Sequence, residues 1–242
     1  MMNFAVIFAG GVGTRMHSKE SVPKQFLKVH GKPIIAHTID IFQRSQDIDA
    51  IVVSIVSSGV EEMKNIVEKY RFTKVIAVVE GGSTGQLSIF NGLKVANNYS
   101  NSDEDIVLIH DGVRPLINEE VIKENIKSVK NFGSAITSTP AKETFVLVND
   151  DKNVVEVVDR KKSFIAKAPQ SFKLEEIFKV EEQAIKSGYT DVVDSSTLMG
   201  MFGKTLHVVS GPYENIKITT PDDFYMFKAL FDAKENEQIY GL

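Results

Sequence analysis

Short runs of β-branched and apolar residues alternate with segments of helical periodicity along most of this chain. Such runs are typical of buried strands, whereas apolar residues spaced three and four apart indicate amphipathic helices. The expected strands span 4–8, 50–56, 74–79, 105–110, 135–139, 144–148, 154–158, 206–209 and 215–219. The expected helices span 33–42, 60–70, 88–96, 118–131, 174–186 and 194–198, with a last one starting at 220–223. Repeated strand and helix units predict a Rossmann-like α/β fold, a mostly parallel sheet with helices on both faces.

The β-rich stretch from about 139 to 165 breaks this alternation. Two of its strands are joined by the polar turn Asn149-Asp150-Asp151-Lys152-Asn153. Because two strands alone cannot bury both of their faces, we expect this segment to be an arm that lies on another surface. A second copy of the chain would supply that surface, so the sequence predicts a homodimer through the β-arm. The 242 residues and 43% hydrophobic content otherwise fit a single domain, 1–242.

Composition excludes several classes of function. The formal net charge is -4, which argues against a nucleic-acid or membrane-surface partner, because both favour a basic face. The chain has no cysteine, which excludes disulfides, thiolate metal sites and a cysteine nucleophile. No apolar run approaches the roughly 20 residues that span a bilayer, and the first residues run directly into a strand. We therefore expect a cytoplasmic protein.

A glycine-rich loop follows the first predicted strand and contains Gly10, Gly11 and Gly13. Glycines at the carboxyl end of a buried strand let backbone N–H groups approach an anion closely. Arg15 and Lys24 add two cations to the same neighbourhood, so the sequence predicts a phosphate site. The Walker pattern and the dinucleotide fingerprint both fail here, because the required Gly-Lys-Ser/Thr and the third glycine are missing.

Two later loops also follow predicted strands. Gly82 and Ser83 precede a helix that carries Ser88, and could admit a base or ribose against the backbone, although a plain turn fits equally well. Asp111 follows a strand beside the predicted phosphate site, where a carboxylate could hold Mg²⁺, while Gly112 leaves room for ligand. The alternative for Asp111 is a carboxylate that caps its own turn.

Five motifs occur in order over nearly the whole chain, and together they resemble the polyol-phosphate cytidylyltransferases. This family includes the enzymes for 2-C-methyl-D-erythritol 4-phosphate and D-ribitol 5-phosphate. The motifs are Ala9-Gly10-Gly11-x-Gly13-Thr14-Arg15-Met16, Pro23-Lys24-Gln25-Phe26, His110-Asp111-x-Val113-Arg114-Pro115, Pro169-Gln170-Ser171-Phe172 and Asn215-Ile216-Lys217-Ile218-Thr219. The form of the glycine loop and Val113 are more similar to the ribitol-phosphate branch.

The resemblance implies how CTP would be held. Its phosphates would bind the backbone amides of the first loop, at Ala9, Gly10, Gly11 and Gly13. Its cytosine and ribose would lie between residues of the second loop and the following helix, namely Gly82, Ser83 and Ser88.

The resemblance also implies a reaction at the α-phosphorus of CTP. Arg15, Lys24 and Lys217 would neutralise charge while an oxygen of the polyol phosphate attacks in line. Nucleotidyl transfer requires mainly such alignment and positive charge. Asp111 would organise Mg²⁺ and the acceptor. Arg160 and Thr144 of a second subunit's arm would bind the acceptor phosphate.

Three positions depart from the family pattern. Gly85 replaces an arginine, Ala168 replaces the threonine of Thr-Pro-Gln, and Val193 replaces the threonine of Thr-Asp. Two of them fall on the polyol side, so they affect the expected acceptor more than the use of CTP. Ribitol 5-phosphate is the favoured acceptor. Methylerythritol phosphate or another short polyol phosphate is the first alternative, and a catalytically silent nucleotide-binding module is the second.

Overall fold

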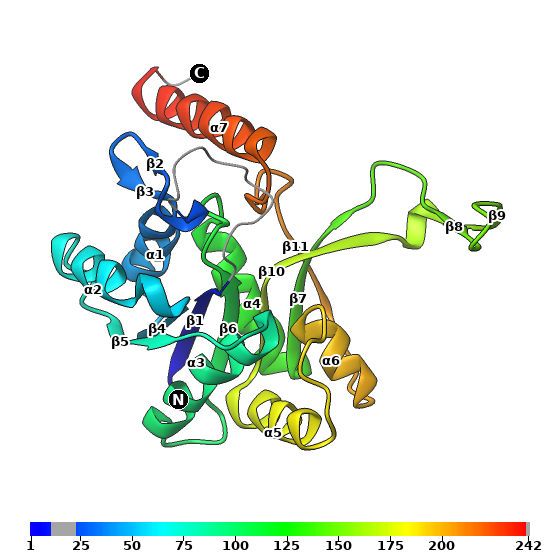
Figure 1. Cartoon of the computed structure of the whole chain (residues 1–242), viewed down its shortest axis with the longest axis horizontal. Coiled ribbons are helices and arrows are strands. Elements are labelled where there is room, and N and C mark those ends of the chain that lie inside the picture. The colour runs from blue at the N-terminus through cyan, green and yellow to red at the C-terminus, as the bar shows by residue number, and fades with distance from the viewer. Residues whose placement is uncertain (11–22, 241–242) are drawn as a thin grey trace.

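The computed structural model describes residues 1–10 and 23–240, and its centre is a seven-stranded sheet (Figure 1). The strand order is β11-β7-β10-β6-β1-β4-β5. In chain order the strands are β1 (Asn3–Ala9), β4 (Ala50–Ile55), β5 (Val75–Glu80), β6 (Ile106–Asp111), β7 (Ser134–Pro140), β10 (Phe164–Lys173) and β11 (Val208–Ser210). Neighbouring strands pair in parallel except β10, which runs antiparallel to both β6 and β7.

Helices cover both faces of the sheet. One face is covered by α1 (Ile34–Arg44), α2 (Val60–Lys69) and α4 (Glu119–Phe132). The other face is covered by α3 (Gly85–Tyr99), α5 (Leu174–Lys186) and α6 (Ser195–Met201). Along β1 the side chains alternate, so that Ile7 packs into the first core while Phe4 and Val6 pack into the second. This period of two lets one apolar strand serve two cores.

A third core joins the segment just before α1 to the last helix of the chain. The short antiparallel strands β2 (Lys28–Val29) and β3 (Lys32–Pro33) form a hairpin, and α7 (Pro221–Tyr240) packs beside it. Val29 and Ile34 meet Ile218 and Phe227 in this core, all of them buried. The segment just before α7 is thereby fixed against the body of the protein.

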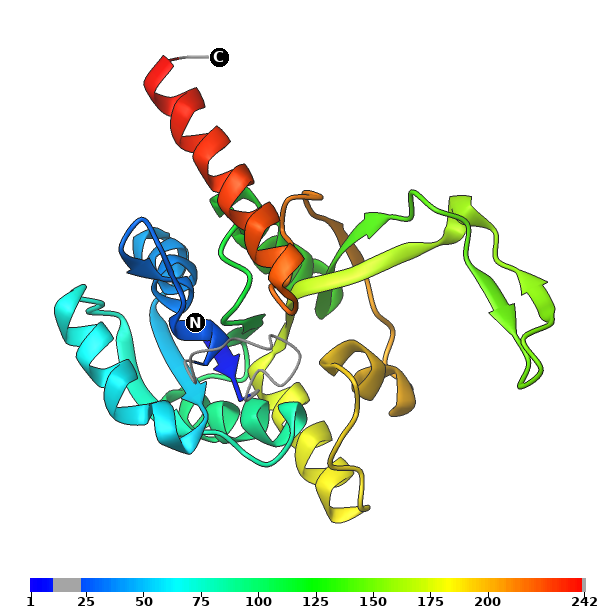
Figure 2. The ribbon, with the colours of Figure 1, turned by 45° about the horizontal axis from the view of Figure 1, so that its top comes forward.

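Two features project from the sheet and its helices (Figures 1 and 2). One is α7, and the other is the arm of residues 139–165, in which β8 (Val146–Val148) and β9 (Val154–Val157) pair antiparallel. The side chains of β8 and β9 are all exposed. Among the described helices, none combines the length and the apolar character needed to cross a bilayer.

The predicted α/β fold with a mostly parallel sheet is confirmed, with two local corrections. The predicted strand at 215–219 does not form, because this segment pairs with no strand and instead bonds to the loop after β6, from Ile218 N to Val113 O at 3.0 Å. The ten-residue β10 was not predicted. It contains Pro169, which disfavours a central strand, and its register with β7 shifts between Ala166 and Gln170 to accommodate the irregularity.

Gly92 on α3 allows this helix to pack closely against the sheet. A Cβ built there would lie 2.6 Å from Val6 Cγ1 on β1. We expect Gly92→Ala to lower the free energy of unfolding by about 1–3 kcal/mol through overpacking. Gly200→Ala on α6 is the matched control, because a Cβ there meets nothing within 4 Å and helix propensity favours alanine by up to about 1 kcal/mol. Denaturant unfolding of both variants checks this, and equal stabilities would contradict it.

Candidate active site

The carboxyl ends of β1, β5 and β6 open into a cavity of about 710 Å³, called here the first cavity. Parallel strands end at the same edge of a sheet, so loops far apart in the sequence meet there. The residues lining the first cavity are Phe8, Ala9, Gly10, Lys24, Gln25, Val56, Ser57, Glu80, Gly81, Gly82, Ser83, Thr84, Gly85, Asp111, Val113, Lys217 and Thr219.

Asp111, the last residue of β6, is held between two cations. Its Oδ2 accepts a hydrogen bond from Arg114 Nε at 2.8 Å, and its Oδ1 lies 2.7 Å from Lys217 Nζ. Burial alone would raise the pKa of Asp111, but the positive charges of Arg114 and Lys217 outweigh burial and lower the pKa to about 2. The carboxylate is therefore ionised at neutral pH.

Arg114 extends this network to two other segments. Its Nη1 donates to the backbone oxygen of Asn215 at 3.0 Å, and Asn215 Nδ2 donates to Ala168 O at 2.6 Å. The loop after β6, the segment before α7 and strand β10 are thus tied together. Sequence reasoning gave Arg114 no role, although it lies in the His110-Asp111-x-Val113-Arg114-Pro115 motif and the motif was a usable signal.

The wall opposite Asp111 is made of closely packed backbone. Ser88 Oγ accepts a hydrogen bond from Gly82 N at 3.1 Å and donates to Thr84 O at 2.8 Å. A Cβ on Gly10 would lie 2.3 Å from Ser88 Oγ, and one on Gly82 would lie 2.3 Å from Leu87 Cβ. The site needs glycine at both positions because side chains would obstruct this packing.

Comparisons with known proteins identify the architecture around this cavity. The family described as "IspD: 2-C-methyl-D-erythritol 4-phosphate cytidylyltransferase" matches residues 3–233. The chain belongs to this cytidylyltransferase family.

Individual relatives carry two names. A ribitol-5-phosphate cytidylyltransferase of Streptococcus agalactiae serotype V is 66% identical over 242 residues, covering 100% of both chains. A 2-C-methyl-D-erythritol 4-phosphate cytidylyltransferase of Clostridium acetobutylicum is 40% identical over 230 residues, covering 95% of this chain and 97% of its own. The crystal structure of a 4-diphosphocytidyl-2C-methyl-D-erythritol synthase from Anaerococcus prevotii is similar with a TM-score of 0.82, 32% identity and 96% coverage of each chain.

In this cytidylyltransferase, most of the predicted site residues within the described segments lie together. Ala9, Gly10, Lys24, Gly82, Ser83, Asp111 and Lys217 all line the first cavity. Gly11, Gly13 and Arg15 lie outside the described residues. Arg160 and Thr144 lie on the exposed arm, which projects away from the strand ends, and neither lines the first cavity (Figure 1).

Two predicted nucleotide contacts are placed differently from expectation. Ser88 is fully buried, and its hydroxyl is bonded within its own loop instead of facing the first cavity. Gly112 is also buried, and a Cβ there would lie 3.2 Å from Ala9 Cβ and 3.3 Å from Ile35 Cδ1. Both residues lie behind the surface of the first cavity and support it. A small residue is needed at each position because its neighbours pack closely, and these neighbours cannot be identified from the sequence.

The donors in the first cavity suit Mg²⁺ only in combination with a nucleotide. Its lining includes two carboxylates, Asp111 and Glu80. Mg²⁺ is commonly bound through one or two carboxylates together with substrate phosphates and water. Lys217, whose side chain is 43% exposed, is the more exposed of the two cations on Asp111 and would have to share that carboxylate with the metal.

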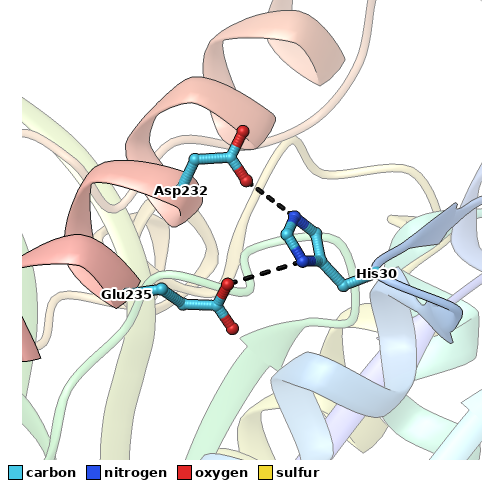
Figure 3. Close-up of side chains that lie close together, drawn as sticks. All are labelled: His30, Asp232 and Glu235. Atoms are coloured by element: carbon cyan, nitrogen blue, oxygen red, sulfur yellow. Dashed lines mark hydrogen bonds and ion pairs between the residues drawn. The ribbon is translucent and has the colours of Figure 1, made fainter. Parts of the chain in front are cut away.

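A second group of ligand-type side chains lies outside the cavity. His30, on the β2–β3 hairpin, has Nε2 2.6 Å from Asp232 Oδ1 and Nδ1 3.4 Å from Glu235 Oε2 (Figure 3). The two carboxylates contact different nitrogens of the ring, and all three side chains are more than two-fifths exposed. This arrangement ties α7 to the hairpin by exposed side-chain contacts, and such surface contacts contribute about 1 kcal/mol or less.

The ion pairs of Asp111 with Arg114 and Lys217 predict that the stability of the protein depends on pH. Because the folded-state pKa is below the usual 3.8, the stabilisation is present above about pH 4 and is lost as the pH falls through about 2. We expect the unfolding free energy of the wild type to drop by about 2 kcal/mol more than that of Asp111→Asn between pH 5 and pH 2. Asp150→Asn, in the exposed turn of the arm, serves as control and should follow the wild type. Denaturant titrations at each pH test this, and parallel curves for wild type and Asp111→Asn would refute it.

Proposed function

We propose that this chain transfers the cytidylyl group of CTP to D-ribitol 5-phosphate, giving CDP-ribitol and pyrophosphate. The observation that supports the chemistry is the meeting of Lys24, Asp111 and Lys217 with the glycine backbone in one cavity. The choice of acceptor is supported by the end-to-end similarity to enzymes named for ribitol 5-phosphate, at 66% identity.

The cavity suits an in-line displacement at the α-phosphorus. An oxygen of the acceptor phosphate forms the new bond to that phosphorus, and the bond to the β-phosphate bridge breaks, so pyrophosphate leaves. Lys24 and Lys217 neutralise the charge that builds on the phosphates, which is the main demand of this reaction. The attacking phosphate monoester is already largely ionised near neutral pH, so no general base is needed.

On the nucleotide side, the backbone at Ala9 and Gly10 is proposed to hold the phosphates, together with Gly11, Gly13 and Arg15. Gly82 and Ser83 are proposed to contact cytosine and ribose, since both line the first cavity. Asp111 would hold Mg²⁺, and this ion would supply charge neutralisation and orientation for the triphosphate.

On the acceptor side, we propose that a second subunit completes the site. Arg160 and Thr144 are exposed on the arm of residues 139–165. The apolar side chains of this arm include Leu147 and Val155, which are 50% and 63% exposed. A partner chain would bury this apolar surface and bring the arm's Arg160 to the acceptor phosphate. We therefore propose a homodimer, and we place it in the cytoplasm as an enzyme that uses CTP.

A second candidate acceptor is 2-C-methyl-D-erythritol 4-phosphate, which the description of the matching family names. Incubation with CTP, Mg²⁺ and one polyol phosphate at a time, followed by measurement of pyrophosphate, separates the candidates. We expect kcat/KM to be highest for ribitol 5-phosphate. A preference for methylerythritol phosphate would overturn the choice of acceptor, and no release with any acceptor would favour a silent nucleotide-binding module.

The shared site predicts complementation between inactive subunits. Lys24→Ala and Arg160→Ala should each lower kcat by on the order of 10²-fold, because each removes one charge-stabilising donor. When both variants are co-expressed and pair at random, mixed dimers carry one intact site, and about a quarter of wild-type activity should return.

The matched control is co-expression of Lys24→Ala with Lys217→Ala. These two residues line the same cavity of one chain, so every site in the mixed dimer lacks one of them. This pair should stay inactive. Failure of the first pair to recover activity would contradict a site shared between subunits.

A further inference from the structure

A second cavity, of about 270 Å³, adjoins the first between α3, β10 and α5. Phe8, Gly85, Asp111 and Lys217 line both cavities, so the two meet at the proposed reaction centre. Arg114 lies at this junction end of the second cavity, bonded to Asp111. A molecule with an anionic group at the junction could extend its remaining atoms into the second cavity.

Gly85 leaves the junction unobstructed. A Cβ built on Gly85 meets nothing within 4 Å, so the position borders open space. Thr84 caps α3 at this point by accepting a hydrogen bond from Leu87 N at 3.1 Å, which fixes where the helix begins. The entrance between the two cavities is therefore wide because a residue without a side chain stands there.

The second cavity contains a buried carboxylate with an unused oxygen. Glu181 on α5 is only 1% exposed, and its Oε2 accepts a hydrogen bond from Gln86 Nε2 at 2.9 Å. In the part of the chain that the structure describes, Oε1 of Glu181 has no hydrogen-bond partner. Burial raises the pKa of Glu181 to about 7, although the bond from Gln86 acts against this. This oxygen keeps accessible surface inside the second cavity, so a molecule there that donates a hydrogen bond can reach it.

The neighbours of Glu181 cannot supply the missing bond by turning. Gln86 Oε1 accepts from Val192 N at 2.9 Å, and its Nε2 also donates to Tyr189 O at 3.1 Å, so this amide is fixed on both sides. Gln170 is fixed as well, because its Oε1 accepts from Ser196 N at 2.8 Å. The free oxygen of Glu181 is thus left for something inside the cavity.

We propose that the second cavity holds the carbon chain of the acceptor, and that Glu181 Oε1 accepts a hydrogen bond from a hydroxyl remote from the acceptor phosphate. Glu181 is then a specificity-determining residue that favours a five-carbon polyol phosphate over a shorter one. This inference rests on the proposed function, since it takes the acceptor phosphate to lie by Lys217.

The chemistry of the cavity fits a polyhydroxylated chain. A hydroxyl that donates to the ionised form of Glu181 makes a charge-assisted hydrogen bond, which is stronger than one between neutral groups. A four-carbon acceptor with the same phosphate position is one hydroxylated carbon shorter, and the proposal requires that its last hydroxyl does not contact Glu181 Oε1. A site that hydrogen-bonds a hydroxyl discriminates strongly against an analogue without it.

The test replaces Glu181 by leucine, which keeps a similar volume and removes both acceptor oxygens. Binding is measured by calorimetry with ribitol 5-phosphate or erythritol 4-phosphate, added to protein loaded with a non-hydrolysable CTP analogue. We expect Glu181→Leu to weaken ribitol 5-phosphate binding by about tenfold or more. The affinities for the CTP analogue and for erythritol 4-phosphate should change by less than about threefold. Unchanged analogue binding also shows that the variant is folded.

Glu182→Leu is the matched control, because it makes the same change one residue along α5 on a side chain that does not line the second cavity. It should bind both polyol phosphates as the wild type does. Equal weakening of both acceptors by Glu181→Leu, or no weakening of either, would overturn the inference. The proposed function fails separately, if the wild type releases no pyrophosphate with ribitol 5-phosphate.

Discussion

The ion pairs of Asp111 are the interaction on which the site depends. A carboxylate at the end of the buried strand β6 is nearly inaccessible to water, and such a group is stable only when its charge is matched. Arg114 supplies one match from the same loop, and Lys217 supplies the other from a segment more than 100 residues later. The folded arrangement of these segments therefore places the Lys217 cation at the first cavity.

Asp111 lies where the first and second cavities meet, and these two cavities differ in character. On one side, closely packed glycine backbone forms a wall of the first cavity, which lets a nucleotide approach the main chain closely. On the other side, buried polar side chains of α3, α5 and β10 surround a smaller cavity, which suits a chain of hydroxyl groups. Lys217 borders both, so one cation can contact the donor and the acceptor.

Sequence patterns predicted the parts of the structure that local physics controls. The helix at 174–186 was predicted to the residue, because its apolar spacing and its first-turn acids are local features. Strand β10 was missed because Pro169 argues against a central strand. Residues 215–219 were assigned as a strand because their side chains alternate between polar and apolar, and this pattern does not show whether another strand lies beside them. The burial of Ser88 and Glu181 could not be predicted from the sequence. Each is an ordinary helical residue in the sequence, and only packing between distant segments buries it.

The central claim is that one phosphorus atom lies between Lys24 and Lys217 at the end of β6. A crystal structure with a non-hydrolysable CTP analogue and ribitol 5-phosphate tests it most directly. The account predicts the α-phosphate in the first cavity with an oxygen in hydrogen-bond contact with Lys24, and the acceptor phosphate in contact with Lys217 and facing the α-phosphorus. An analogue bound with its α-phosphate outside the first cavity, or an acceptor phosphate remote from Lys217, would contradict the account.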